Sequence, residues 1–153
     1  MRIGVLSIGV GAFYGCFNLA EVVICEGVNS IGNTAFAYCT SLKSVDMGSV
    51  ETIGSGAFFG CGSLEYVEIP SSVTTIEDSV FAACNNLTHV YCKAITPPMA
   101  IGTVYDESGN VAWSAFSGGA LEALYVPTES VEIYKSADGW SEYAPLIYPA
   151  TFE

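Results

Sequence analysis

The most reactive side-chain type in this sequence is cysteine. The chain has six cysteines, four of which recur at intervals of 22 or 23 residues. These four are Cys16, Cys39, Cys61 and Cys84. The spacing lacks the close Cys-x2–4-Cys pairs of zinc sites. A disulfide at every second unit is disfavoured as well, because it would give equivalent positions of the repeat different surroundings. We therefore predict a row of small buried thiols. Cys92 should also lie in the core, and Cys25 should be the exposed thiol.

Other motifs that could carry catalysis are incomplete. His89 is the only histidine, and no nucleophile elbow or orienting acid accompanies it. Glycines within 9–15 and 54–60 approach a dinucleotide-binding loop, but their G-x-G-x-x-x-G spacing fits repeat turns instead. The acidic turn at 106–110 is far from an EF-hand loop, which favours an ordinary turn over a calcium site. We expect a non-enzymatic protein with no cofactor and no metal.

The cysteines are part of an internal repeat. Its units begin at Ile8, Ile31, Ile53 and Ile76, at spacings of 23, 22 and 23 residues. In every unit a Phe follows five residues later, a Cys three residues after that, and then Leu, Val and a final apolar residue. The phenylalanines are Phe13, Phe36, Phe58 and Phe81. A degenerate fifth unit follows an insertion, with Phe116, Leu124 and Val126 in the repeated pattern.

The end of each unit, Leu-x-x-Val-x-Ile, alternates as a short strand with one buried face does. One unit cannot fold alone, whereas stacked units pair every strand and cover each other's interior. The sequence therefore predicts a repeat solenoid, a right-handed β-rich superhelix of short strands, turns and short helices. Equal residues of successive units should meet about 4.8 Å apart, so the phenylalanines should form one column.

The frame C-x-x-L-x-x-V-x-I-P-x-x-V-x-x-I-G-x-x-A-F, clearest from Cys61 to Phe81, resembles the BspA-like leucine-rich repeat over about residues 5–93. The tail is similar to the family's usual ending, with ITPP at 95–98, LYVP at 124–127 and VEIYKSADGWSEYAPLI at 131–147. Glu77, where glycine is usual, and the stretch 99–113 depart from the family pattern. The resemblance implies a secreted or surface-attached bacterial protein, often from host-associated anaerobes, that acts in adhesion and protein binding.

We predict a single leucine-rich-repeat domain over 1–153. Its repeats should occupy about 5–93, an insertion 94–114, and a degenerate last repeat with a cap 115–153. Pro97 and Pro98 should stop the stacked unit, because proline donates no ladder hydrogen bond. Turn residues between the apolar arms 101–105 and 111–113 predict a projecting hairpin.

A helix should cover the C-terminal end of the stack. Thr128 or Ser130 is positioned to cap it, and Asp138 with Gly139 should end it after about residue 137. Its apolar residues would face the last unit, as solenoid caps do. They are Val131, Ile133, Tyr134 and Trp140.

Strand alternation also predicts an exposed face, because the third and fifth positions of each strand pattern point away from the core. The third positions are Glu21, Ser44, Tyr66, His89 and Ala123, and the fifth are Val23, Asp46, Glu68, Tyr91 and Tyr125. We predict a contact centre of Tyr66, His89, Tyr91 and Tyr125, with Glu21, Asp46 and Glu68 favouring a basic partner. Tyrosine suits binding surfaces, although strands also favour tyrosine for packing alone.

Charge and length limit the partners. The chain has 4 basic and 16 acidic residues and a net charge of −12, which disfavours nucleic acid and anionic membranes. No apolar run is long enough to insert into a membrane. We expect a protein or glycan ligand, host-derived, and an extracellular or cell-surface location, although this chain starts without a leader and is interpreted as trimmed. The alternative is a structural spacer or self-association module of a longer array, paired through the N-terminal edge.

Overall fold

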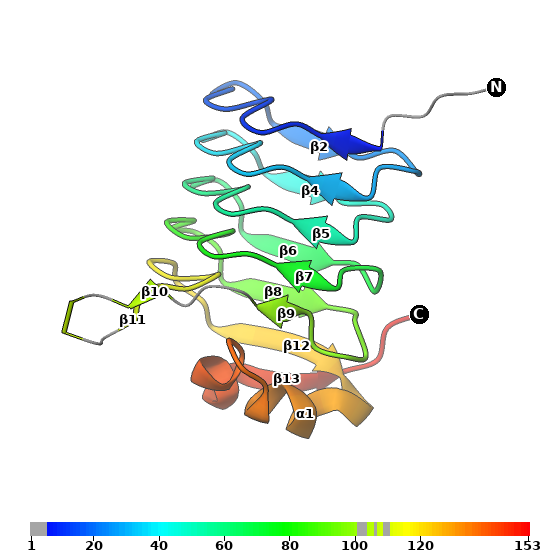
Figure 1. The fold of residues 1–153 in the computed structure, drawn as a ribbon. Helices are drawn as coiled ribbons and strands as arrows, with labels where there is room; N and C mark the ends of the chain where they lie inside the picture. The colour runs from blue at the N-terminus through cyan, green and yellow to red at the C-terminus, as the bar shows by residue number, and fades with distance from the viewer. Residues whose placement is uncertain (1–5, 101–103, 106, 109–110) are drawn as a thin grey trace.

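The computed structural model describes residues 6–100, 104–105, 107–108 and 111–153. Successive units wind into a solenoid, with short parallel strands stacked in columns and turns projecting at the sides (Figure 1). This confirms the predicted repeat solenoid. Within the described residues, no helix has the length and apolar character that crossing a membrane requires.

One column of strands is built from the anchors of the repeat. It contains β1 (Ser7–Ile8), β3 (Ser30–Ile31), β5 (Thr52–Ile53), β7 (Thr75–Ile76) and β9 (Met99–Ala100). The pairing is parallel throughout, and each anchor isoleucine lies opposite the next, ending with Ile76 opposite Ala100. Residues one repeat period apart in the sequence are therefore paired partners in this sheet.

The second column holds the Leu-x-x-Val-x-Ile strands. It contains β2 (Glu21–Val23), β4 (Ser44–Asp46), β6 (Tyr66–Ile69), β8 (His89–Cys92), β12 (Ala123–Pro127) and β13 (Ile147–Ala150). These strands form two separate sheets, β2-β4 and β6-β8-β12-β13, with no ladder between β4 and β6. The repeat pattern did not predict this interruption. The interruption changes the shape of the exposed strand face between β4 and β6.

The core is organised by a stack of phenylalanine rings. Phe13, Phe36, Phe58, Phe81 and Phe116 follow one another at centroid separations of 5.1, 5.3, 5.4 and 5.6 Å, with ring planes within 4° of parallel. The central rings are completely buried. Each ring fills the space above the next, so the predicted column is confirmed and includes the degenerate fifth unit.

The insertion is narrower than predicted. Pro97 and Pro98 do not stop the unit, because β9 follows them directly and pairs with β7. Pro98 is buried, and its carbonyl oxygen accepts a hydrogen bond from Trp140 Nε1 at 2.8 Å. The extra residues therefore lie after β9, inside the fifth unit, rather than from residue 94.

A hairpin leaves the stack within this insertion. Its strands β10 (Val104–Tyr105) and β11 (Val111–Trp113) pair antiparallel, and they project from the side of the solenoid (Figure 1). The predicted arm residues 101–103 and part of the predicted turn lie outside the described residues.

The C-terminal segment lies across the end of the stack (Figure 1). It contains the 3-10 helix η1 (Thr128–Ser130), the helix α1 (Val131–Ser136), the 3-10 helix η2 (Ser141–Leu146) and then β13. Tyr134 and Trp140 are 0% and 1% exposed, and the Tyr134 hydroxyl donates to the Ala94 carbonyl at 2.7 Å. The segment thus covers polar backbone groups of the last units as well as apolar side chains.

Two details of the predicted helix are wrong. Ser130 stands at the N-cap of α1, but its hydroxyl does not cap the helix; it donates to the Ile95 carbonyl at 2.7 Å. Ile133 is 54% exposed rather than buried, because on a helix this short only one face meets the stack and Tyr134 occupies it.

The turns between the two strand columns require a left-handed backbone at two positions per unit. Gly11, Gly15, Gly56 and Gly60 have φ between 59° and 70°. These are the glycines of the apparent dinucleotide pattern, so repeat turns account for them. In the other units Thr34, Tyr38, Ser79 and Ala83 adopt φ of 53–60° at the same places, although a side chain makes this conformation unfavourable.

We predict that Ala83→Gly stabilises the protein. Ala83 occupies the place of Gly60 with φ 57°, and removing its methyl group relieves strain that outweighs the added flexibility of glycine, for a gain of up to about 1 kcal/mol. Urea unfolding measures the change. Ala82→Gly is the control: Ala82 is buried with ordinary φ, so this variant should be less stable. A loss of stability in A83G would contradict the strain argument.

Candidate functional site

The thiol row is a structural ladder. Each buried thiol donates to the phenylalanine carbonyl of the preceding unit: Cys39 to Phe13 at 3.3 Å, Cys61 to Phe36 at 3.2 Å and Cys84 to Phe58 at 3.2 Å. All six cysteines are free. No group of metal-binding side chains is assembled in the part of the chain that the structure describes. The predicted row is confirmed for Cys39, Cys61 and Cys84, which are buried, whereas Cys16 in the first unit is only partly buried.

Burial also keeps these thiols protonated. It raises the pKa of Cys84 to about 12 and that of Cys92 to about 11, and it also raises the pKa of Cys61. Because only the thiolate is a nucleophile, these side chains are chemically inert. Cys25 is exposed, as predicted.

His89 is part of a surface stack of rings. Its Nδ1 lies 2.8 Å from the Thr88 hydroxyl, and its ring stacks on Tyr125 at 6.2 Å between centroids and 10° between planes. Tyr125 in turn stacks on Tyr91 at 5.1 Å and 10°. Tyr66 meets Tyr91 edge to face at 6.5 Å and 80°. The structure therefore brings together the four residues of the predicted contact centre.

The rings lie together because the strands pair in register. Tyr66 stands opposite His89, and Tyr91 opposite Tyr125, on parallel strands β6, β8 and β12. Outward positions thus form rows across the sheet. The third-position row ends differently from the prediction: Ala123 is 6% exposed, because its single methyl group lies below the larger side chains of its neighbours.

Sequence reasoning missed one member of this surface. Tyr148, 45% exposed, lies opposite Tyr125 on β13, with ring centroids 6.0 Å apart. Residues 146–149 (LIYP) resemble 124–127 (LYVP) in combining a tyrosine and aliphatic residues with a final proline. This resemblance is the signal that could have identified another strand. The sequence placed it in a cap instead.

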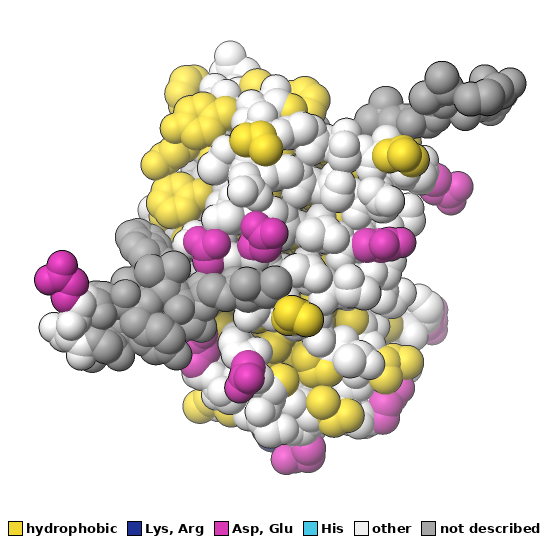
Figure 2. Space-filling view, in the orientation of Figure 1, with side chains coloured by type: hydrophobic (Ala, Val, Ile, Leu, Met, Phe, Trp, Pro, Cys, Tyr) yellow, Lys and Arg dark blue, Asp and Glu magenta, His cyan; other side chains and the backbone are white. Residues whose placement is uncertain are grey.

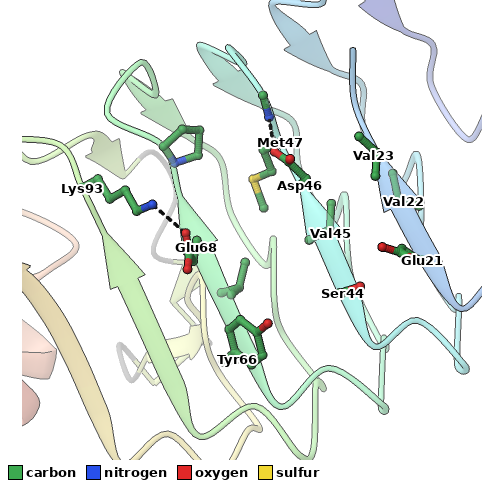
Figure 3. A pocket seen from close by; sticks show the side chains of 13 residues that line it. Glu21, Val22, Val23, Ser44, Val45, Asp46, Met47, Tyr66, Glu68 and Lys93 are labelled. Carbon is green, nitrogen blue, oxygen red and sulfur yellow. Dashed lines mark hydrogen bonds and ion pairs between the residues drawn. The ribbon is translucent and has the colours of Figure 1, made fainter. Parts of the chain in front are cut away.

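The acidic half of the face surrounds a groove between β4 and β6. Glu21, Asp46 and Glu68 are exposed along it, as predicted. The groove is also lined by Val22 of β2, by Val45 of β4 and by Met47, which follows β4 (Figure 3). Its volume is about 470 Å³. Lys93 Nζ forms an ion pair with Glu68 at 2.6 Å, so the one cation lining the groove is already paired.

A second aromatic group lies on the turn side of the solenoid and was not predicted. Hydrophobic side chains gather over the turns of the N-terminal units (Figure 2). Tyr38, 41% exposed, meets Tyr14 at 5.5 Å and Phe59 at 5.4 Å, edge to face. Gly60 makes room for the Tyr38 ring, since a Cβ there would lie 3.0 Å from it. Tyr14 and Phe59 come one residue after the core phenylalanine of their units, whereas Tyr38 comes two residues after it. The three rings therefore do not share one position in an alignment of the repeats.

We predict that the native thiols react in two classes. Iodoacetamide at about pH 8, near the ordinary thiol pKa, should alkylate Cys25 and spare Cys61, Cys84 and Cys92. The unfolded chain loses thiol protons near 9.0 whereas the folded chain keeps them to about 11 or 12 at Cys92 and Cys84. The free energy of unfolding should therefore fall as the pH rises above 9.0.

Peptide mapping by mass spectrometry locates the alkylated residues, with the urea-unfolded chain as the fully reactive control. Rapid labelling of Cys61 or Cys84 in the folded protein would contradict their burial.

Comparisons with known proteins give a consistent result. The family model described as BspA type leucine rich repeat region matches residues 6–99 in 6 copies. A comparison with curated proteins found no match. The solved leucine rich repeat protein of T. pallidum is 26% identical, with a TM-score of 0.71 over 94% of this chain and 61% of that one.

Two further solved structures share the fold. A leucine rich cell surface protein from Faecalibacterium prausnitzii is 24% identical, with a TM-score of 0.55 over 80% of this chain and 39% of that one. The pneumococcal vaccine antigen PcpA is 16% identical, with a TM-score of 0.61 over 97% of this chain and 42% of that one. This chain therefore spans 61% or less of the length of each solved relative. On its matched repeats and its stacked fold, the chain belongs to the BspA type leucine-rich repeat family.

Proposed function

We propose that the strand face formed by β2, β4, β6, β8, β12 and β13 is a protein-binding surface, and that the chain is a non-enzymatic adhesion or recognition module. The observation that carries this proposal is the row of surface rings on β6, β8, β12 and β13 beside the exposed carboxylates of β2, β4 and β6. Rigid aromatic side chains at the centre of a surface supply most of the binding energy in protein interfaces.

Charge supports a basic partner. The chain carries a net charge of −12, and Lys93 and Lys135 are each in an ion pair with a glutamate. An acidic surface steers positively charged partners and repels negatively charged ones. Family membership supports action at or outside the bacterial cell surface, with a host-derived protein as partner.

The geometry of the rings favours a protein over a glycan. Sugars bind aromatic side chains by lying on an open ring face. Tyr91 and Tyr125 instead cover one face of each other, with planes only 10° apart, and His89 covers more of Tyr125. The stack therefore offers ring edges and hydroxyl groups, which suit the mixed polar and apolar surface of a protein.

We predict that the triple variant Tyr66→Ala, Tyr91→Ala, Tyr125→Ala loses partner binding. Peptides selected from a displayed random library on the wild-type protein should be rich in Lys and Arg, and fluorescence anisotropy should show binding at least about tenfold weaker to the variant. Loss of the ring contacts should reduce stability only modestly, by about 0.5–1.5 kcal/mol per pair.

The matched control is Tyr14→Ala, Phe17→Ala, Tyr38→Ala, which removes three exposed rings from the turn side. Unchanged affinity is expected there. If the selected peptides bind the strand-face variant as well as the wild type, the strand face is not the binding surface.

Self-association through the N-terminal edge, the alternative function, has one observation behind it. Val10, Phe13 and Phe17 of the first unit are 76%, 42% and 62% exposed. The hydrogen bonds of the turns oppose a symmetric contact, however. Gly11, Phe13 and Gly15 donate their N–H groups to carbonyls of the next unit, and every later unit repeats this direction. Among the described residues, the matching carbonyls of Val10, Ala12 and Tyr14 accept no hydrogen bond, so two such ends would present acceptors to acceptors.

We therefore predict a monomer in solution. Sedimentation velocity over a wide concentration range should give a constant sedimentation coefficient, because the turns of two first units cannot pair with each other. A coefficient that rises with concentration, and returns to the monomer value in Phe13→Asp, would instead support the self-association module.

A further inference from the structure

The groove on the strand face exists because the second column of strands is interrupted. β2 pairs with β4, and β6 pairs with β8, each in an unbroken parallel register. β4 and β6 do not pair in a ladder, although their units remain joined elsewhere, for example through Gly54 N to Ile31 O at 2.8 Å and Phe36 N to Ala57 O at 2.8 Å. The solenoid is thus opened on one side only.

The opening coincides with a shortened loop. From the core valine of the strand to the next anchor isoleucine there are nine positions in the first and third units, Val22 to Ile31 and Val67 to Ile76, but eight from Val45 to Ile53. Gly48 in this loop has φ 54°, and a Cβ there would lie 2.6 Å from the Ile24 carbonyl oxygen. The end of β4 is therefore held against the first unit.

Electrostatics keep the gap open. In a continuous column Asp46 would stand opposite Glu68, as Val23 stands opposite Asp46 and Glu68 opposite Tyr91. Like charges directly opposite destabilise strand pairing. Instead, Asp46 accepts a hydrogen bond from Gly48 N at 2.9 Å, and Glu68 turns to Lys93 on the other side at 2.6 Å.

The opening leaves an apolar floor below an acidic rim. Val45 is only partly buried, whereas its counterparts Val67 and Val90 are 1% and 0% exposed. Above it stand the carboxylates of Glu21, Asp46 and Glu68 and the 49% exposed ring of Tyr66 (Figure 3). With Lys93 as its one cation, the groove has three negative charges against one positive charge.

We propose that this groove receives a lysine or arginine side chain of the partner protein. The proposal deepens the binding function of the strand face and rests on it. The methylene stem of such a side chain packs on the valines, as long cationic side chains do on apolar surfaces. Its charged head lies among the carboxylates and beside Tyr66, where a cation–π contact adds to the attraction. It also relieves the repulsion between Asp46 and Glu68.

Two other occupants fit less well. Within the described chain no group of acidic side chains is placed to hold a metal ion. An inserted strand would need β4 and β6 about 9.6 Å apart, twice the ordinary strand spacing, whereas Cα atoms of the two strands approach within 8 Å. The groove admits a side chain but not a backbone.

The test uses the whole protein and a blocked tetralysine peptide as the probe, followed by two-dimensional ¹H–¹⁵N NMR at low ionic strength. The amide signals of β4, of β6 and of Gly48 should shift and saturate on titration, and added salt should reverse the shifts because the ions are exposed. The same peptide with acetylated lysines, which has no charge, should cause no shift.

Charge variants separate the groove from general attraction to an acidic protein. Lys93→Gln removes the internal competitor and should strengthen binding by roughly two- to fivefold, the effect of one exposed ion pair. Lys135→Gln, the same charge change on α1, should leave affinity unchanged. Glu68→Gln should weaken binding by a similar factor, whereas Glu51→Gln, an exposed residue outside the groove, should not.

The outcomes distinguish this inference from the function it rests on. Shifts confined to β8, β12 and β13 would overturn the groove and leave the strand face as the binding surface. Shifts confined to the turn side would overturn both. Equal effects of K93Q and K135Q would reduce the interaction to general electrostatics, and the same shifts with calcium chloride alone would assign the groove to a metal ion.

Discussion

The contact on which the structure depends is that between a residue and its own counterpart one unit away. The phenylalanine rings of five units stack with planes within 4° of parallel, and the thiols of Cys39, Cys61 and Cys84 each donate to the phenylalanine carbonyl of the preceding unit. A single unit therefore has no complete hydrophobic core, because its core side chains are covered by those of the neighbouring units. As long as these contacts stay in register, the loops between them are free to vary. The fifth unit accordingly holds an extra hairpin after β9 and still places Phe116 on Phe81.

The same register makes the two ends of the stack chemically different. N–H groups of the turns point to the following unit and carbonyl groups to the preceding one. At the C-terminal end, the segment after β12 satisfies carbonyls that lie outside the turns, in the loop between β8 and β9: Tyr134 donates to Ala94, Ser130 to Ile95 and Trp140 to Pro98. Buried carbonyls without partners are costly, so this segment contributes hydrogen bonds as well as apolar cover. Its two buried aromatic side chains, Tyr134 and Trp140, each combine a ring with a hydrogen-bond donor.

The candidate site is a consequence of repetition and of one departure from it. Because outward positions align across parallel strands, Tyr91, Tyr125 and Tyr148 form one row without any local sequence motif. The row continues through Glu68 to Asp46, where the shortened second unit ends the pairing and a groove replaces the ladder. A ligand on this face would meet ring edges and hydroxyls at one end and carboxylates over an apolar floor at the other. Specificity on such a surface depends on the spacing of the units as much as on the residues themselves.

The sequence by itself determined everything that repeats. Its period of 22 or 23 residues placed the anchors, the phenylalanine column, the buried thiols and the outward rows, because equal positions in a stack have equal surroundings. Tertiary structure alone decided the features in which a unit differs from its neighbours. Pro97 and Pro98 precede a paired strand, Ser130 bonds to Ile95 rather than capping α1, and Tyr148 belongs to a further strand. The gap between β4 and β6 also depends on the short loop after β4, in which Gly48 packs closely against the Ile24 carbonyl of the first unit. These outcomes follow from contacts between residues far apart in the chain, which no local pattern records.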